Sequence, residues 1–429
     1  MHRVALHVPP IPTPSPVHNV SPTPVSEKEP SILAALSPRA IPMNRLLTYS
    51  GGRYGWQAAV VPGNHSKQDV VYVVNRVKDY FLSLETRTKF KTTVPMGGLQ
   101  LPDYQTAIIA DESGQLVVSD HVALPELRSD EVLIRTAAVA VNPSDVKLTG
   151  SMGAPSATAG SDCAGIVVAV GDTASGAFQI GDRVCAPAVP MDPLSPRSGA
   201  FAQYVPVTAD LALKVPENMT LEHAASLGTG LATIGYALFR CLRIPGHPDR
   251  VATKPAVVLV WGGSSATGTM AIQLIRRQAF NYHDTDCAAQ IKAFTHNALD
   301  YALDCVCDAT SMAACYQAIG RAGGAYTTLE PYQQQSHVRK RVRPSWLLGT
   351  ALLGREIGWK PPYHVHADPM LRRFGSDWFQ CAQRLLSCGE IRAHPVRIGE
   401  NAGFQHILEG VELLRRKAVS GEKLVYRIP

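Results

Sequence analysis

The chain of 429 residues is long enough for two or three domains. Hydrophobic residues make up 45% and charged residues 18%, as in ordinary globular proteins, and no apolar run is long enough for a membrane-spanning helix. The net charge of +6 comes from residues 1–96, which hold 11 Lys and Arg against 5 Asp and Glu. The remainder is neutral, so the charge gives no indication of nucleic-acid binding.

Residues 1–95 are predicted to be a disordered or poorly structured extension. Ten prolines fall within residues 1–43, and proline removes the backbone amide that helices and sheets need. The run DVVYVVNRVKDYFLSL at 69–84 is compatible with a short strand or helix, but nothing around it indicates a domain. We interpret 1–95 as an appendage. An incorrect start site in the gene model, upstream of Met96, is one explanation for it.

The segment 104–215 has the pattern of an all-β, barrel-like unit. Short β-type runs alternate with Gly, Pro and Asp turn signals. These runs are TAIIA at 106–110, QLVVS at 115–119, EVLIRTAAVAV at 131–141, AGIVVAVG at 164–171 and DRVCAPAV at 182–189.

From residue 222 the pattern changes to alternating helix and strand. The small apolar residues of 223–242 have helical spacing, and AVVLVW at 256–261 is typical of a parallel strand buried on both faces. Strand, helix and strand patterns follow at 301–308, 311–320 and 323–330, then helical stretches at 372–389 and 404–416 and a last strand at 423–428. This order predicts an α/β fold with a Rossmann-type, doubly wound parallel sheet.

A glycine-rich turn joins the strand at 256–261 to the helix that follows. Gly262, Gly263 and Gly268 allow a tight turn and close approach of the backbone to a pyrophosphate. The helix N-terminus offers free amides and the positive end of a dipole. The residues favour a dinucleotide site, although a βα loop without a ligand is the simpler interpretation of the same pattern.

The motifs AVAVNPSDVK at 138–147, GSDCAG at 160–165 and GDRV at 181–184, with the order of units, resemble the medium-chain dehydrogenase/reductase superfamily. The resemblance implies a GroES-like catalytic domain over 96–225 plus about 370–429. It implies a Rossmann-type cofactor-binding domain over 226–369.

A finer resemblance covers about 100–429 and rests on HAASLGTGLATIGYAL, VWGGSSATGTMAIQL, AIGRAGGAYTTLEP and SGEKLVYR. These motifs are similar to those of the trans-acting enoyl reductases of fungal polyketide biosynthesis. The resemblance implies a monomer that uses NADPH to reduce an α,β-unsaturated thioester. The nine cysteines have no framework spacing and indicate reduced thiols, so we expect a cytoplasmic location. The partner would be a highly reducing polyketide synthase, or its hybrid with a peptide synthetase, presenting the acyl group on a carrier domain.

The resemblance also assigns site residues. Those expected to bind the cofactor are Ser144, Asp145, Val146, Lys147, Ser264, Ser265, Ala266, Thr267, Tyr282, Thr328 and Leu329. Those expected to line the substrate cleft are Leu227, Gly228, Thr229, Gly230, Leu231, Ala232, Thr233, Ile234, Trp346, Leu347, Leu348, Gly349 and Thr350. Lys147 is the candidate proton donor, with bound water as the alternative. Ser144 could equally cap a helix, and Lys147 could be a solvated surface charge.

Two features depart from the superfamily pattern. Asn142 stands where zinc-dependent members have Cys, and Ser161 and Asp162 stand where they have His and Glu, so we expect no metal. In addition, MAIQLIRRQ at 270–278 runs directly into AFNYHD, although a strand and a helix should separate them. The missing turn would read the 2′-phosphate, and its loss predicts a gap or a mispaired strand in the sheet. The two explanations are a splicing error in the gene model and a real deletion.

Other motifs have weaker functional interpretations. Cys305 and Cys307 are expected on opposite faces of a strand. For His364 and His366, a surface loop is preferred to a pair of metal ligands. The basic run Arg339, Lys340, Arg341 and Arg343 is either a carrier-docking surface or a solvated loop. The competing functions are a stand-alone quinone or enone reductase and a degenerate scaffold that binds a synthase without catalysis.

Overall fold

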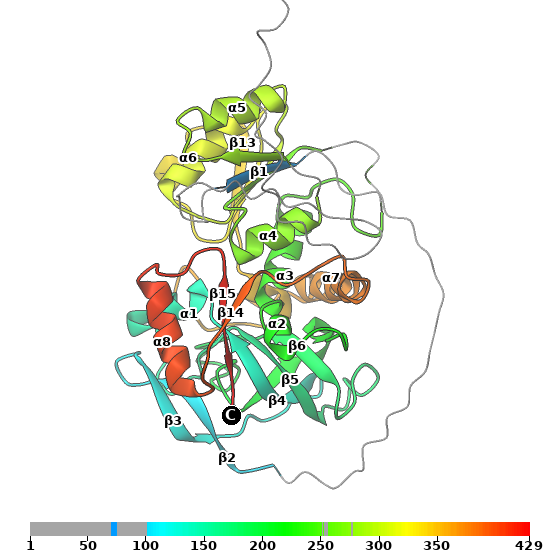
Figure 1. Cartoon of the computed structure of the whole chain (residues 1–429), viewed down its shortest axis with the longest axis vertical. Coiled ribbons are helices and arrows are strands. Elements are labelled where there is room, and N and C mark those ends of the chain that lie inside the picture. The colour runs from blue at the N-terminus through cyan, green and yellow to red at the C-terminus, as the bar shows by residue number, and fades with distance from the viewer. Residues whose placement is uncertain (1–69, 75–100, 251, 253–255, 276–277) are drawn as a thin grey trace, which may run out of the picture. The chain divides into compact units, whose positions relative to one another are not determined.

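The computed structural model describes residues 70–74, 101–250, 252, 256–275 and 278–429. The described residues all belong to a unit that spans His65–Pro429. Two larger sheets organise it (Figure 1). Among the described helices, none is long and apolar enough to cross a membrane.

The first sheet has seven strands in the order β14-β15-β4-β5-β6-β8, with β7 also paired to β4. The pairs are antiparallel except β14 and β15. The strands are β4 (Glu131–Ala140), β5 (Asp162–Val170), β6 (Arg183–Pro187), β7 (Tyr204–Thr208), β8 (Leu213–Lys214), β14 (Val396–Ile398) and β15 (Lys423–Arg427). Gly165 permits the close crossing of β4 and β5, because a Cβ there would lie 2.1 Å from the Arg135 carbonyl oxygen. The β-rich unit predicted from the turn signals is therefore present, with β15 returning from the C-terminus.

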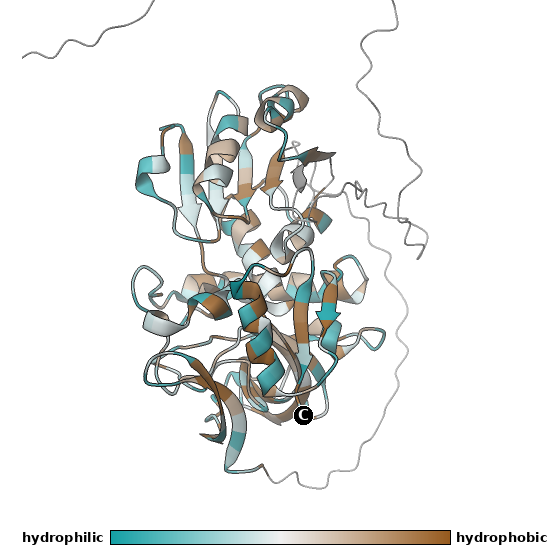
Figure 2. Cartoon of the chain, turned by 60° about the vertical axis from the view of Figure 1, so that its left-hand side comes forward, coloured by the Kyte–Doolittle hydropathy of each residue, from teal (hydrophilic) through white to brown (hydrophobic). Residues whose placement is uncertain are grey.

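Several short elements surround this sheet. They are the hairpin β2 (Tyr104–Ala110) and β3 (Leu116–Ala123), helices α1 (Pro143–Lys147), α2 (Leu221–Ala224), α3 (Gly228–Gly235), α7 (Pro369–Ser387) and α8 (Phe404–Arg415), the 3-10 helices η1 (Gly150–Met152), η2 (Ala209–Leu211) and η5 (Gly349–Leu353), and the π-helix η3 (Tyr236–Cys241). Helix α7 buries Trp378 against α3, where the indole donates to the Leu231 carbonyl at 2.8 Å. Hydrophobic residues gather in strands of both sheets (Figure 2).

The second sheet has six strands in the order β10-β1-β9-β11-β12-β13. Its elements are β1 (Val70–Val74), β9 (Val258–Trp261), α4 (Ala266–Gln273), β10 (Gln278–Asn281), α5 (Cys287–Phe294), β11 (Tyr301–Asp304), α6 (Ala309–Ala318), β12 (Gly324–Thr328), η4 (Gln334–Ser336) and β13 (Val342–Trp346). Strands β9, β11, β12 and β13 are parallel. Leu259 and Trp261 pack in one cluster with residues of α5 and α6, while Val258 and Val260 join the larger core that contains residues of α4. The alternation along β9 thus buries the sheet on both faces.

Strand β1 comes from the N-terminal segment and lies between β9 and β10. It is antiparallel to both, with Tyr72 opposite Val260 on one side and Ala279 on the other. This is the position next to the first Rossmann strand, where the sequence predicted a gap or a mispaired strand. Residues 70–74 fall within the extension expected to lack structure; the other residues of 1–95 lie outside the described part of the chain.

The predicted combination of a β-rich unit and a parallel α/β sheet is confirmed. Two local predictions differ from the structure. Strand β11 ends at Asp304, so Cys305 and Cys307 lie in the following bend, and Cys307 has a φ of +69°. Helix α5, on the other side of the short β10, was not predicted because 287–294 carries little apolar periodicity.

Candidate functional site

The glycine-rich turn lies at the carboxyl edge of the parallel sheet, between β9 and α4. Gly262 has a φ of +79°, and a Cβ on Gly268 would lie 2.3 Å from the Gly262 carbonyl oxygen. Both positions therefore require glycine. The amides of Ala266 and Thr267 occupy the first turn of α4, where an α-helix has no carbonyl partner to offer them. Free amides at a helix N-terminus suit an anion, so the phosphate site expected from the sequence is compatible with this geometry.

Ser265 builds this turn. Its hydroxyl donates to the Gly262 carbonyl at 2.7 Å and accepts from the Gly268 amide at 3.1 Å, so it is the N-cap of α4. Both hydrogen bonds fix the direction of the first helical amides. The hydroxyl predicted to hold a phosphate is therefore engaged in capping, and Ser264, Ala266 and Thr267 remain half-buried beside it.

An aromatic group borders the turn. The Tyr282 ring follows β10 and lies 5.7 Å from the Trp261 ring at the end of β9, and 4.3 Å from the His283 ring. Cys305, after β11, packs near Gly262, where its Cβ is 3.3 Å from the position of an added Cβ. The predicted adenosine-side residue Tyr282 thus lies close to the turn.

The ends of β11 and β12 complete this edge. Asp304 is in register with both Trp261 and Thr328, and burial raises the pKa of its carboxyl group although Ser311 and Tyr326 donate to it. Thr328 is buried, and the Leu329 amide donates to the Cys307 sulfur at 3.3 Å. The side chain of Thr328 therefore faces the interior of the sheet edge.

Helix α1 begins with a buried polar network. The Asp145 carboxylate accepts from the Asn142 amide at 2.7 Å and from the Ser161 hydroxyl at 2.7 Å, and Ser161 lies 2.9 Å from the Ser144 hydroxyl. Burial raises the pKa of Asp145 to about 7. Asp145 is 2% exposed, and its hydrogen bonds hold Ser161 and Asn142 in place. Ser144 and Val146 are half-buried.

A second buried network surrounds Asp162. Its carboxylate accepts from the Asn142 side chain at 2.9 Å, from the Thr229 amide at 2.6 Å and from the Lys423 ammonium. Lys423 is buried and also contacts the Ser226 carbonyl oxygen at 3.3 Å. Lys423 thus already neutralises Asp162, the one carboxylate among the positions where zinc-dependent members have ligands. The other two positions hold the Asn142 amide and the Ser161 hydroxyl. This donor set does not fit a catalytic zinc ion.

Lys147, at the end of α1, contacts the carboxyl edge of the other sheet. Its ammonium forms an ion pair with Glu330, two residues beyond β12. The other Glu330 oxygen accepts from the Tyr363 hydroxyl at 2.8 Å, and burial together with this bond raises the pKa of Tyr363 to about 12. The chain Lys147–Glu330–Tyr363 therefore joins α1 to the strand ends that carry the glycine-rich turn.

Sequence reasoning missed Glu330 and Tyr363. An acidic residue directly after a parallel strand, at the edge where α/β sheets bind ligands, was a signal that could have identified Glu330. Tyr363 lies in a segment without periodicity, and no signal marked it. Its ring packs at 6.1 Å against Trp346, which belongs to the predicted substrate pocket.

The predicted substrate segments are mostly interior. Helix α3 and the residue before it are buried except at Thr229, because they pack against α4, α7 and η5. In the second segment Leu347 and Thr350 are buried, whereas Trp346, Leu348 and Gly349 are half-buried. Gly349 and Gly230 allow close packing with Thr233 and Met270. Thr229, Trp346 and Leu348 are thus the predicted substrate residues whose side chains are partly accessible.

The edge of the sheet fits part of a nicotinamide dinucleotide. The amides of the α4 first turn suit a diphosphate, and the Tyr282 ring suits a flat base. The element that would read the ribose is replaced by β1, whose direction is opposite to that of its neighbours. The described residues that follow β10 at this edge are Tyr282 and His283.

Comparisons with known proteins agree with this architecture. The family model of the alcohol dehydrogenase GroES-like domain matches residues 128–217. A trans-enoyl reductase of Gibberella zeae is 45% identical over 354 residues, which cover 77% of this chain and 98% of the relative. A trans-enoyl reductase of Aspergillus clavatus is 43% identical over 363 residues, or 78% and 99% of the two chains.

Solved structures share the fold at low sequence identity. An alcohol dehydrogenase superfamily protein from Novosphingobium aromaticivorans matches with a TM-score of 0.59 and 19% identity, over 76% of this chain and all (100%) of the other. The CurK enoyl reductase matches with a TM-score of 0.55 and 17% identity, over 76% and 99% of the chains.

Proposed function

We propose the function of this chain from the premise that it belongs to the trans-enoyl reductase family. We infer that it uses NADPH to reduce the α,β-unsaturated thioester that a polyketide synthase, or its peptide-synthetase hybrid, presents on an acyl carrier domain. It would act as a monomer in the cytoplasm.

The observation that carries the proposal is the contact between Lys147 and Glu330 at the carboxyl edge. It joins α1, which belongs to the β-rich unit, to the strand ends beside the glycine-rich turn. A dinucleotide bound with its diphosphate at Ala266 and Thr267 would lie along that edge. Ser144 and Lys147 would then be near its nicotinamide end, which supports the assignment of both residues to the cofactor site.

The nicotinamide, when bound, supplies a hydride to the β-carbon of the enoyl thioester. The chain must then stabilise negative charge on the thioester oxygen and deliver a proton to the α-carbon. Lys147 is a candidate for that delivery, since Glu330 holds its ammonium and Tyr363 holds Glu330. Bound water remains the other source. We propose that no zinc takes part, because Lys423 already pairs with Asp162.

An acidic substitution in the first turn of α4 tests the cofactor site. Ala266→Glu places a negative charge where the diphosphate is proposed to bind, so we expect NADPH affinity to fall by at least about tenfold. Ala309→Glu is the matched control, because Ala309 has the equivalent position in α6 and is exposed. Titration of NADPH and NADH by fluorescence measures both affinities. Equal affinities of the two variants would contradict the assignment of the site.

The alternative functions predict other results. A scaffold is favoured by the antiparallel β1, which lies beside β9 where a strand leading to a ribose-reading turn was expected. It would show no saturable binding of either dinucleotide. A stand-alone quinone reductase would oxidise NADPH with free quinones and show no preference for the carrier-bound enoyl thioester. Preferential turnover of the carrier-bound substrate supports the proposal over both.

A further inference from the structure

A short two-stranded ribbon at 356–366 carries an acidic residue and two histidines. Ile357 and Val365 form an antiparallel bridge, with backbone hydrogen bonds of 2.9 Å and 3.1 Å in the two directions. Neighbouring residues of a strand point to opposite faces. Glu356, His364 and His366 flank the bridged pair, so all three point to the same face of the ribbon.

Their donor atoms are close together. The Glu356 carboxylate lies 3.2 Å from Nε2 of His364, and the His364 and His366 ring centroids are 4.6 Å apart. One ligand atom of each residue lies within 4.8 Å of those of the other two. Ligands at ~2.1 Å around a tetrahedral ion are roughly 3.4 Å apart. Because Glu356 and His366 are exposed and His364 is half-buried, side-chain rotation can close the difference.

The donors are also free to bind. Within the described part of the chain, His366 and Glu356 form no hydrogen bond or ion pair with a residue outside this cluster. Two imidazoles and one carboxylate with open positions suit a first-row divalent ion such as Zn²⁺. Residue 358, which lies opposite His364, is glycine and adds no side chain to this face.

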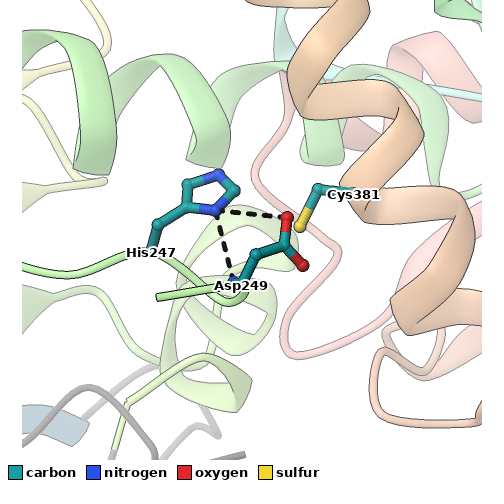
Figure 3. A group of neighbouring side chains, drawn as sticks. All are labelled: His247, Asp249 and Cys381. Carbon is teal, nitrogen blue, oxygen red and sulfur yellow. Dashed lines mark hydrogen bonds and ion pairs between the residues drawn. The ribbon is translucent and has the colours of Figure 1, made fainter. Parts of the chain in front are cut away.

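A second cluster has the same number of donors but differs in its charge. His247, Asp249 and Cys381 lie together where the 245–250 loop meets α7 (Figure 3). Arg384 already pairs with the Asp249 carboxylate, and the Asp249 amide donates to Nδ1 of His247 at 3.3 Å. Burial, with the nearby Asp249 charge, raises the pKa of Cys381 to about 12. A metal ion there would have to displace the Arg384 guanidinium and the Cys381 thiol proton. We therefore interpret this cluster as a structural contact between the 245–250 loop and α7.

We propose that Glu356, His364 and His366 form a binding site for a divalent transition-metal ion of the Zn²⁺ type, separate from the reductase chemistry. The ion would fasten the two arms of the ribbon together. Tyr363 lies between those arms and donates to Glu330. The ion would thereby restrict the segment that supports Glu330, without taking part in the reaction.

Calorimetric titration of the full-length chain with Zn²⁺, after chelator treatment, tests the site. We expect one ion per chain, and at least about tenfold weaker binding in His366→Ala and Glu356→Gln, since each loses a ligand. Zn²⁺ should raise the melting temperature of the unchanged protein but not of His366→Ala. Neither measurement depends on reductase activity.

Two matched variants separate this site from adventitious binding. His406 is a half-exposed histidine that pairs with Glu409 at 3.1 Å but has no second histidine, so His406→Ala should bind Zn²⁺ like the unchanged protein. Cys381→Ser should also leave binding unchanged. Absence of Zn²⁺ binding, or binding that survives His366→Ala but is lost in Cys381→Ser, would overturn the proposal.

Discussion

Glu330 is the residue whose substitution should most directly affect turnover. It accepts from Lys147 with one oxygen and from Tyr363 with the other. Glu330→Gln keeps the shape but removes the charge that holds the ammonium, so we expect kcat to fall roughly tenfold. Steady-state kinetics on an enoyl thioester, with NADPH affinity measured in parallel, check this.

Asp182→Asn is the control for that substitution. Asp182 pairs with Lys214 at 2.9 Å and is far along the chain from Glu330. Its substitution by Asn also removes one negative charge from an ion pair. Its kcat should stay at the unchanged value. If Glu330→Gln weakens NADPH binding and leaves kcat unaltered, Glu330 belongs to cofactor binding and not to turnover.

Asp145 gives the protein a pH-dependent stability. Its pKa is raised to about 7 in the folded state by burial, against the usual value of 3.8. Its contribution is fully present below pH ~4 and is lost as the pH rises toward about 7, because the unfolded chain releases this proton above pH ~4 whereas the buried carboxyl group of the folded state keeps it up to about pH 7. Asp145→Asn removes this loss. Relative to the unchanged protein, the variant should gain on the order of 1–3 kcal/mol between pH 4.5 and 8.

Urea unfolding at several pH values measures that difference. The comparison is between the two proteins at each pH, so that other titrating groups cancel. A difference in unfolding free energy that does not change with pH would show that Asp145 is already ionised throughout this range.

At the level of elements, β1 should stabilise the six-stranded sheet that carries the glycine-rich turn. A chain covering 96–429 lacks β1, whereas one covering 65–429 retains it together with the whole unit that contains the two sheets. Without β1, β9 and β10 have unpaired backbone groups facing one another. We expect 96–429 to lose on the order of 2–4 kcal/mol of unfolding free energy and to bind NADPH more weakly.

Chemical denaturation of the two truncated chains and the full chain measures this effect. The 65–429 chain should match the full chain. Equal stability of 96–429 and 65–429 would mean that the pairing of β1 contributes nothing to the sheet.

Much of the fold follows from the order of short apolar runs and turn residues, and both the predicted fold class and the family resemblance are confirmed. Gly262 and Gly268 are required by backbone geometry, which a sequence shows directly. The pairing of β1 could not be predicted, because it joins residues far apart in the chain through backbone groups that any sequence has. The place of Glu330 directly after a parallel strand was a usable signal, but its contacts with Lys147 and Tyr363 are tertiary, and local pattern carries no signal for them.

The assigned positions show the same division. Ser265 was correctly placed at the turn, yet its hydroxyl caps α4, since serine suits either task. The residues of 227–234 have the small side chains of a tightly packed helix. From sequence alone such a helix cannot be distinguished from the wall of a cleft.

At the level of the whole molecule, the basic run divides into two parts. Arg339 donates to the Tyr316, Ile319 and Gly320 carbonyl oxygens at the end of α6, so it is structural. Lys340 and Arg341 are exposed and remain available to an acidic partner surface. Reversing these two charges should raise KM for a carrier-bound enoyl thioester about tenfold at low salt and leave the free thioester unaffected.

The double variant Arg392→Glu and Lys417→Glu is the control, because it reverses two exposed charges elsewhere. It should leave KM for both substrates unchanged. An equal rise in KM on carrier-bound and free thioester with the Lys340 and Arg341 variant would exclude docking as the cause.

The position of β1 also sets an order for synthesis. The strand at Val70–Val74 leaves the ribosome about 200 residues before β9 and β10 are both complete. At 5–20 residues per second the delay is roughly 10–40 s. A strand with no partner during that interval is a target for chaperones, because its pairing must wait until the middle of the chain has been made.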